Sequence, residues 1–197
     1  SDGKAGSLPS DGGLSLHPPT TQEPVDRYRY DPLAPTPTAG GAILGDRAGV
    51  KIQNGIEDRT DVLIYSTKKL TKSVEVTGPV KAVLYVSTDA ISTDFTVKLV
   101  DVHPDGTAYN LSDGILRRSY PEQDQPTKIE IELWPTSNVF LKDHQIRIEV
   151  SSSNFPRYDR NLNTGDLSAR AVETKIARQV IHHSKQFPSH IVLPFIP

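Results

Sequence analysis

The sequence predicts an all-β sandwich, and three features of the chain support this fold class. Apolar and polar residues alternate with a period of two in several segments, which gives each strand one buried face and one wet face. Sixteen prolines and thirteen glycines interrupt the 197 residues, and such frequent punctuation suits short strands better than long helices. No strand–helix–strand alternation occurs in the sequence, so a parallel α/β sheet is not expected within this chain.

About ten short strands are expected, with turn signals about every eight to twelve residues. The alternation is cleanest in residues 128–134 and 145–151, where isoleucines share one phase and charged residues the other. The sequence His103-Pro104-Asp105-Gly106 predicts a tight turn, because proline fixes φ and glycine accepts positive φ. A turn is predicted at Gly78-Pro79, and a short helix over 168–179 is the alternative to a strand over 175–181. The predicted strands are 62–65, 74–77, 80–87, 95–102, 107–111, 115–120, 128–134, 145–151, 175–181 and 191–195.

Residues 1–60 form a separate region by composition, rich in Gly, Pro, Ser and Thr. Each X-Pro bond pushes the preceding residue toward extended conformations, so little regular structure is expected. Tyr28 and Tyr30 nevertheless give this region side chains that can pack. We therefore expect an ordered, extended N-terminal strap over 1–60 that lies against another surface, and a sandwich over 61–197. A disordered linker is the alternative for the strap.

Composition and charge exclude several classes of function. The formal net charge is −2 and no basic block stands out, so nucleic-acid binding has little electrostatic support. No apolar run is long enough for a transmembrane helix, and no membrane partner is expected. Cysteine is absent, which rules out disulfides, thiolate zinc sites and cysteine nucleophiles. The chain begins with Ser1 and has no methionine, from which we expect a fragment or a processed product.

No residue is assigned a catalytic, cofactor or metal role. The Gly-x-Ser-x-Gly motif of hydrolases does not occur. Asp101 and His103 would share one face of a strand, but a histidine in a turn is usually solvated. Zinc needs three or four converging ligands, and the other histidine pairs have no convincing spacing for that. Oxygen donors near two turns suggest calcium only weakly, because the same residues favour turns for local hydrogen bonding; they are Asp105, Asn110 and Asp113.

The most unusual segment is 153–165, which packs arginine, aspartate, asparagine and two aromatic residues into an irregular stretch. It either shapes a ligand pocket or a domain interface, or forms a self-bonded loop. The candidate residues of this substrate or interface loop are Asn154, Phe155, Arg157, Tyr158, Asp159, Arg160 and Asn161. Trp134, Tyr28 and Tyr30 are candidates for stacking on a ligand such as a sugar, although aromatic residues more often build cores and interfaces.

Four blocks of sequence carry a resemblance to a known family. They are residues 57–65, 93–106, 151–165 and 188–194, and Tyr30-Asp31-Pro32 with Gly40-Gly41 precede them. Together they are similar to the C-terminal domain of the X-Pro dipeptidyl-peptidase and cocaine esterase family of α/β-hydrolases, over nearly the whole chain. The resemblance implies a β jelly roll, like galactose-binding modules, that packs on a catalytic domain carrying the Ser-Asp-His triad. No catalytic residue of the family matches a position in this chain.

One departure from the family pattern concerns the residues before the 145–151 strand. The family usually has Gly-His-Arg there, and this chain has Asp143-His144-Gln145. The missing arginine puts in doubt any salt bridge that the family makes at that point. An aspartate in place of glycine predicts a different turn.

The resemblance implies the non-catalytic C-terminal domain of a serine hydrolase, of X-Pro dipeptidyl-peptidase or acyl-esterase type. Such a domain stabilises the catalytic domain, helps shape its substrate site, and is inactive alone because it lacks the triad. Its expected partner is an upstream α/β-hydrolase domain of the same parent protein, in the cytoplasm, and the strap over 1–60 would follow that domain. The alternatives are an independent carbohydrate- or ligand-binding module and a surface for homo-oligomerisation. The bond that the parent cleaves is left open among an ester, an amide and a peptide bond after an X-Pro pair.

Overall fold

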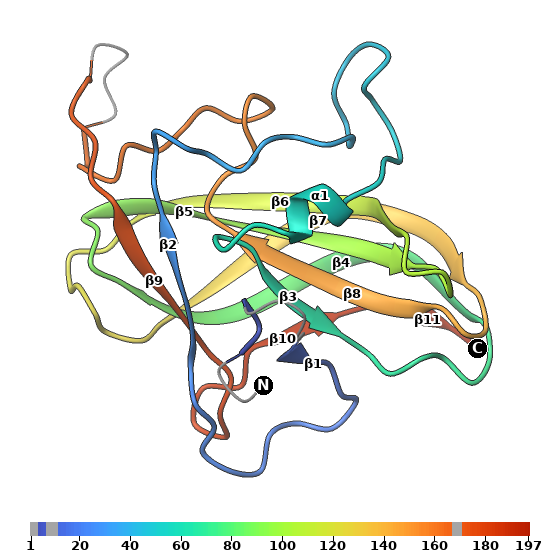
Figure 1. Cartoon of the computed structure of the whole chain (residues 1–197). Coiled ribbons are helices and arrows are strands. Elements are labelled where there is room, and N and C mark those ends of the chain that lie inside the picture. The colour runs from blue at the N-terminus through green and yellow to red at the C-terminus, as the bar shows by residue number, and fades with distance from the viewer. Residues whose placement is uncertain (1–3, 7–11, 167–170) are drawn as a thin grey trace.

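Two β-sheets face each other in a computed structural model of the chain, which describes residues 4–6, 12–166 and 171–197 (Figure 1). The five-stranded sheet has the order β1-β3-β8-β5-β6, formed by Gly12–Gly13, Leu63–Ser66, Gln145–Ser151, Ser92–Val102 and Ala108–Ser119. The six-stranded sheet has the order β10-β4-β9-β2, and β7 and β11 also pair with β4. Its strands are β10 His190–Val192, β4 Val74–Thr88, β9 Ala177–His182, β2 Asp26–Tyr30, β7 Thr127–Phe140 and β11 Phe195–Ile196, and the short helix α1 spans Asn54–Glu57.

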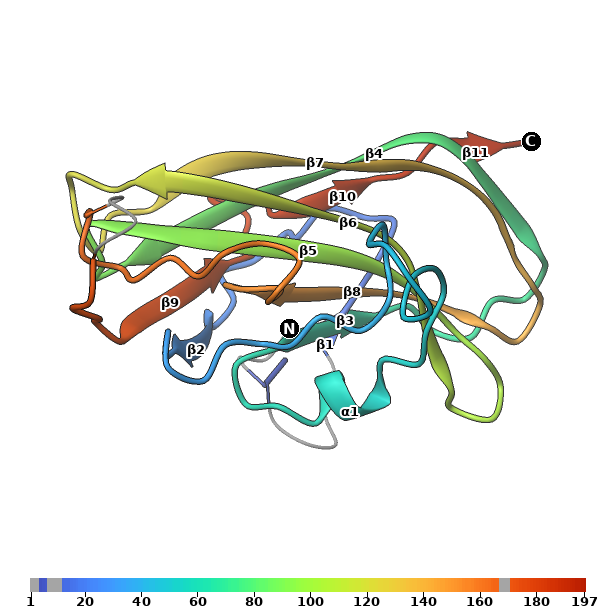
Figure 2. The same ribbon diagram turned by 90° about the horizontal axis from the view of Figure 1, so that it is seen from above.

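The hydrophobic core lies between the two sheets and confirms the predicted β-sandwich. Figure 2 shows β4 and β7 in one layer and β5 and β8 in the other. In β7 the buried side chains of Ile129, Ile131 and Leu133 alternate with exposed charged residues, as the period of two predicts. On the opposite layer Phe95 and Leu99 of β5 are completely buried. Each such side chain contributes about 1.5–3 kcal/mol when it leaves water. The jelly-roll and galactose-binding-like labels stay predictions.

Several predicted strands are parts of longer ones. The turn predicted at Gly78-Pro79 is wrong, because β4 runs through it with a shift of register between Gly78 and Val80. Gly78 has a φ of +135°, and a glycine beside a proline suits a bulge, where the ladder is interrupted. Likewise β6 joins the segments 107–111 and 115–120 into one strand. The glycine and proline residues in these segments therefore mark irregularities within strands and not the ends of strands.

The described part of the N-terminal strap contributes β2 to the six-stranded sheet. Strand β2 pairs antiparallel with β9, so segments far apart in the sequence lie side by side (Figure 1). Alternate residues of β2 are buried, Asp26, Tyr28 and Tyr30 among them. The helix predicted as the alternative over 168–179 is not formed in its described part, because 171–176 is irregular and β9 begins at Ala177; residues 168–170 lie outside the described residues. The strap's place after a hydrolase domain stays a prediction.

No helix in the described part of the chain is long and apolar enough to cross a membrane.

Candidate functional site

The irregular segment 152–166, called the 152–166 loop below, follows β8 and is held in place by the strap. The backbone N–H of Phe155 donates to the carbonyl of Thr36 at 2.9 Å, and the N–H of Thr38 donates to the carbonyl of Phe155 at 2.7 Å. Thr36 also donates its N–H to the hydroxyl of Ser153 at 2.8 Å. The loop therefore has strand-like pairing at its start without belonging to either sheet, which fixes its path over the sandwich.

A buried aspartate anchors the far half of the loop. Asp94 of β5 is 1% exposed, and Arg117 of β6 donates to both of its carboxylate oxygens, each at 2.9 Å. The side-chain amide of Asn161 donates to the same carboxylate at 2.8 Å. The hydrogen bonds to Asp94 raise the pKa of Arg117 above its ordinary value, so the guanidinium stays charged. Arg117 also pairs with Asp159 of the loop at 3.0 Å, which ties a second loop residue to β6.

A second aspartate anchors the near half. Asp113 of β6 is 7% exposed; it forms an ion pair with Arg157 and accepts a hydrogen bond from Asn154 Nδ2 at 2.9 Å. The guanidinium of Arg157 lies over the ring of Tyr158, 5.0 Å from its centroid, and burial raises the pKa of Tyr158. Buried charged groups are costly unless they are paired, and both aspartates here are paired with arginines.

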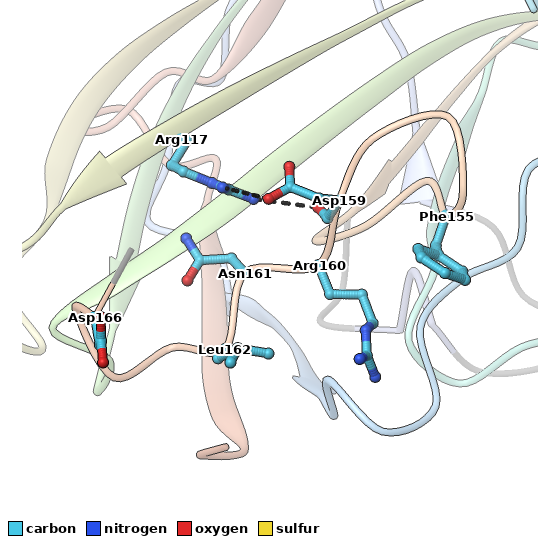
Figure 3. Close-up of a pocket in the computed structure, with 7 residues that line it drawn as sticks. All are labelled: Arg117, Phe155, Asp159, Arg160, Asn161, Leu162 and Asp166. Atoms are coloured by element: carbon cyan, nitrogen blue, oxygen red, sulfur yellow. Dashed lines mark hydrogen bonds and ion pairs between the residues drawn. The ribbon is translucent and has the colours of Figure 1, made fainter. Parts of the chain in front are cut away.

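Between these anchors the loop forms a pocket of about 260 Å³ (Figure 3). Figure 3 shows Arg117 facing Asp159, with Arg160 beside Phe155 on the other side of the pocket. Arg160 donates to the carbonyl of Pro32 at 2.9 Å, and its guanidinium lies 5.7 Å from the ring of Phe155. The lining residues are Arg117, Phe155, Asp159, Arg160, Asn161, Leu162 and Asp166.

The pocket can hold or contact a small polar group. Among the residues that the structure describes, its lining consists of two arginines, two aspartates, an asparagine, a leucine and a phenylalanine. A volume below the usual range of about 300–1,000 Å³ for ligand sites favours a contact surface over a deep substrate site.

The structure brings the seven predicted loop residues into two groups. Phe155, Asp159, Arg160 and Asn161 line the pocket, and Asn154, Arg157 and Tyr158 surround Asp113. Asn154 and Asn161 are each 3% exposed, whereas Phe155, Asp159 and Arg160 are exposed. Their role toward a substrate or a partner domain stays a prediction.

The three aromatic residues expected to stack on a ligand do not form one surface. Trp134 of β7 is 60% exposed, but Tyr28 and Tyr30 of β2 are 4% and 0% exposed, so neither ring has a face open to a ligand. Tyr28 is hydrogen-bonded to Ser152 at 2.9 Å, and Tyr30 donates to the carbonyl of Asn161 at 3.1 Å. Burial raises the pKa of both tyrosines. Their hydroxyls bind the loop to the strap. The stacking hypothesis is therefore wrong for Tyr28 and Tyr30, because packing buries both rings.

The sequence reasoning missed the anchors Asp94, Arg117 and Asp113 as partners of the loop. A signal for Asp94 was present, because an acidic residue stands at the start of a strand whose residues are all buried. A buried carboxylate requires a cation or several donors. The arginine that supplies this cation is determined by the pairing of β5 with β6, in which Asp94 lies opposite Arg117.

The departure at Asp143-His144-Gln145 leaves the turn in a conformation that glycine would favour. Asp143 has a φ of +69°, in the left-handed region where aspartate is better tolerated than most residues. The aspartate therefore does not remove the left-handed turn. In place of an arginine, Gln145 donates from its amide to the carbonyl of Thr67. Two residues after Gln145, Arg147 forms an ion pair, and its Nη1 lies 2.7 Å from Glu57 Oε2.

The fold and the site define a β-sandwich domain with a charged loop that is held by ion pairs to two buried aspartates. A family model described as the X-Pro dipeptidyl-peptidase C-terminal non-catalytic domain matches residues 2–192. The chain belongs to this family, and it is a non-catalytic domain of the kind found at the C-terminus of these hydrolases. This agrees with the resemblance carried by the four sequence blocks.

Several known proteins are similar to the chain. The cocaine esterase of Rhodococcus sp. (strain MB1 Bresler) is 52% identical over 188 residues, which cover 88% of this chain and 33% of the esterase. An aminopeptidase from a Thaumarchaeota archaeon of marine sediment superposes with a TM-score of 0.84 at 29% identity, over 96% of this chain and 36% of that one. An α-amino acid ester hydrolase also gives 0.84 at 29%, over 94% and 35%. The chain thus spans about a third of the length of these relatives.

Proposed function

We propose that the chain stabilises the catalytic domain of a serine hydrolase and helps to shape its substrate site through the 152–166 loop. The parent enzyme would be of X-Pro dipeptidyl-peptidase or acyl-esterase type and would transfer an acyl group to water. The observation that carries the proposal is the loop itself, which is irregular in path but pinned at both halves by buried ion pairs. The relatives support it, because each is named as a hydrolytic enzyme of about three times this length.

The side chains that the loop directs outward suit a contact with another domain. Phe155 is 40% exposed, the Asp159 side chain is 82% exposed, and Arg160, the next residue in the sequence, is also exposed. Interfaces within a chain combine apolar area with polar groups at their edges, and aromatic and arginine residues dominate their energetics. A loop that is already ordered loses little conformational entropy when it meets its partner. Rigid presentation of Phe155 and Arg160 is therefore what a permanent interdomain contact requires.

Independent ligand binding has weaker support. Of the three aromatic residues that would form a sugar-stacking platform, only Trp134 is exposed, and a single ring gives limited stacking area. Trp134 is on β7, whereas the pocket is lined by the 152–166 loop and Arg117 of β6. Trp134 therefore serves as the control position for a test of the loop.

The test compares the complete gene product with this chain. The complete protein should hydrolyse a small chromogenic ester, and the chain alone should not exceed the buffer rate. In the complete protein the double substitution Phe155→Ala with Arg160→Ala should lower the temperature of thermal inactivation or raise KM, whereas Trp134→Ala should do neither. Circular dichroism of the isolated chain should show the same fold for both variants.

Two outcomes contradict the proposal. One is hydrolysis by the isolated chain in proportion to its concentration. The other is a complete protein whose kinetics and thermal inactivation are unchanged by the double substitution at the loop. Saturable binding of a glycan that Trp134→Ala abolishes would favour the independent module instead.

A further inference from the structure

Three side chains with metal-binding atoms converge at the opposite end of β5 from Asp94. Asp101 lies on β5, His103 begins the turn that leads to β6, and His144 directly precedes β8. The pairing of β5 with β8 places Asp101 opposite Ile146, which brings His144 over the end of β5. One ligand atom from each of the three residues lies within 4.8 Å of the others.

The contacts among the three side chains are close and mutual. His144 Nδ1 lies 2.9 Å from Asp101 Oδ1, and His103 Nε2 lies 3.9 Å from Asp101 Oδ2. The two imidazole rings are 4.4 Å apart between centroids. The carboxylate thus uses one oxygen toward each imidazole, so that all three groups face a common region.

We propose that Asp101, His103 and His144 bind a divalent zinc ion, with water in the fourth position. Zinc takes nitrogen and carboxylate oxygen ligands at about 2.0–2.2 Å in a tetrahedron, which places adjacent ligand atoms about 3.3 Å apart by that geometry. With one ligand atom from each residue, the three atoms lie within 4.8 Å of one another, so the side chains must move closer together to reach this value. Two imidazoles with a single carboxylate suit zinc and the later first-row metals, whereas calcium and magnesium require more oxygen ligands.

Burial gives the site two fixed ligands and one adjustable ligand. Asp101 and His144 are 7% and 6% exposed, so their positions are set by packing. The His103 side chain is 41% exposed, which leaves an approach from solvent and allows the ring to close the remaining distance. The ring of Tyr109 lies 4.8 Å from the His103 ring and limits how far it can swing away.

The test uses the untagged chain and zinc chloride in isothermal titration calorimetry. The wild-type chain should bind one zinc ion per molecule, and His103→Gln should weaken the affinity at least about tenfold, because even a lost outer-shell contact costs that much. The matched control is His190→Gln, which removes an exposed histidine on β10 and should leave binding unchanged. With cobalt chloride the wild-type chain should give the intense visible absorption of a tetrahedral site, and His103→Gln should lose it.

Circular dichroism checks that each variant is folded, and Asp101→Asn, which keeps the shape of the side chain, provides a second ligand variant if His103→Gln is not folded. Its zinc affinity should also fall at least about tenfold. The proposal is overturned if the wild-type chain shows no saturable zinc binding. It is equally overturned if the folded ligand variant binds zinc as tightly as wild type, or if His190→Gln weakens binding as much as the ligand variant does.

Discussion

Replacing Arg117 with alanine tests whether the buried carboxylate of Asp94 holds the 152–166 loop. Arg117 donates two hydrogen bonds to Asp94, and it is joined there by Asn161 at 2.8 Å. Without the guanidinium, a carboxylate that is 1% exposed keeps a neutral amide donor but has lost its cation. The folded state then bears most of the cost of keeping that charge out of water.

The magnitude follows from how deeply each partner is buried. Removing one member of a fully buried pair costs about 3–5 kcal/mol, and exposed pairs contribute about 0–1 kcal/mol. The Arg117 side chain is 32% exposed whereas that of Asp94 is 1% exposed, so the pair lies between these limits. With Asn161 still donating to Asp94, we expect the free energy of unfolding to fall by about 2 kcal/mol.

Equilibrium unfolding of the chain in urea measures this change. Arg118→Ala is the matched control, because Arg118 is the next residue of the same strand and has weaker contacts: a 3.4 Å hydrogen bond to the carbonyl of Lys128 and a position 6.0 Å from the centroid of the Tyr120 ring. This substitution should cost less than about 0.5 kcal/mol. A cycle with Asp94→Ala should give a coupling energy of at least about 1 kcal/mol. A loss for Arg117→Ala no larger than that for Arg118→Ala, or a coupling energy near zero, would refute the reasoning.

Three further changes have expected outcomes in the same urea assay. Gly114→Ala should cost about 1–3 kcal/mol because a Cβ there would meet the backbone of β7, whereas Gly55→Ala in α1, with open space around it, should not destabilise; equal losses would contradict this. Burial and neighbouring positive charge lower the pKa of His182 below its ordinary 6.5, so the unfolded chain takes up that proton first and stability falls as the pH drops below about 6.5. Between about pH 7.5 and 5.5, His182→Gln should therefore lose less stability than wild type, and His190→Gln should behave as wild type. Asp143→Gly relieves a φ of +69° and should raise stability by about 0.5 kcal/mol; a clear decrease would show that the aspartate side chain matters there.

The strands were predictable because their burial follows a local pattern. In residues 128–134 every second side chain is buried, and a period of two is legible without knowing the neighbours. Strand β2 was not predicted, since its sequence Asp-Arg-Tyr-Arg-Tyr lies among prolines and becomes a strand only by pairing with β9. The same pairing is why Tyr28 and Tyr30 are buried rather than open to a ligand.

The candidate loop was recognised from its composition, but its internal division was not. Nothing local distinguishes Arg157, whose charge is taken up by Asp113, from Arg160, which lines the pocket. The same holds for the proposed zinc ligands, because His144 lies 41 positions after His103 in the sequence. Long-range pairing decides such contacts, and a single sequence does not show it.

The sequence by itself determined the β-sandwich class, the family through its four blocks, and the position of the candidate loop. Alternation and turn chemistry are local properties, so they can be read residue by residue. The tertiary structure alone decided which charges are buried, that Asp94 and Asp113 anchor the loop, and that Asp101, His103 and His144 meet. The physical reason is that burial and convergence depend on which strands pair, and β5, β6 and β8 bring together residues that are distant along the chain.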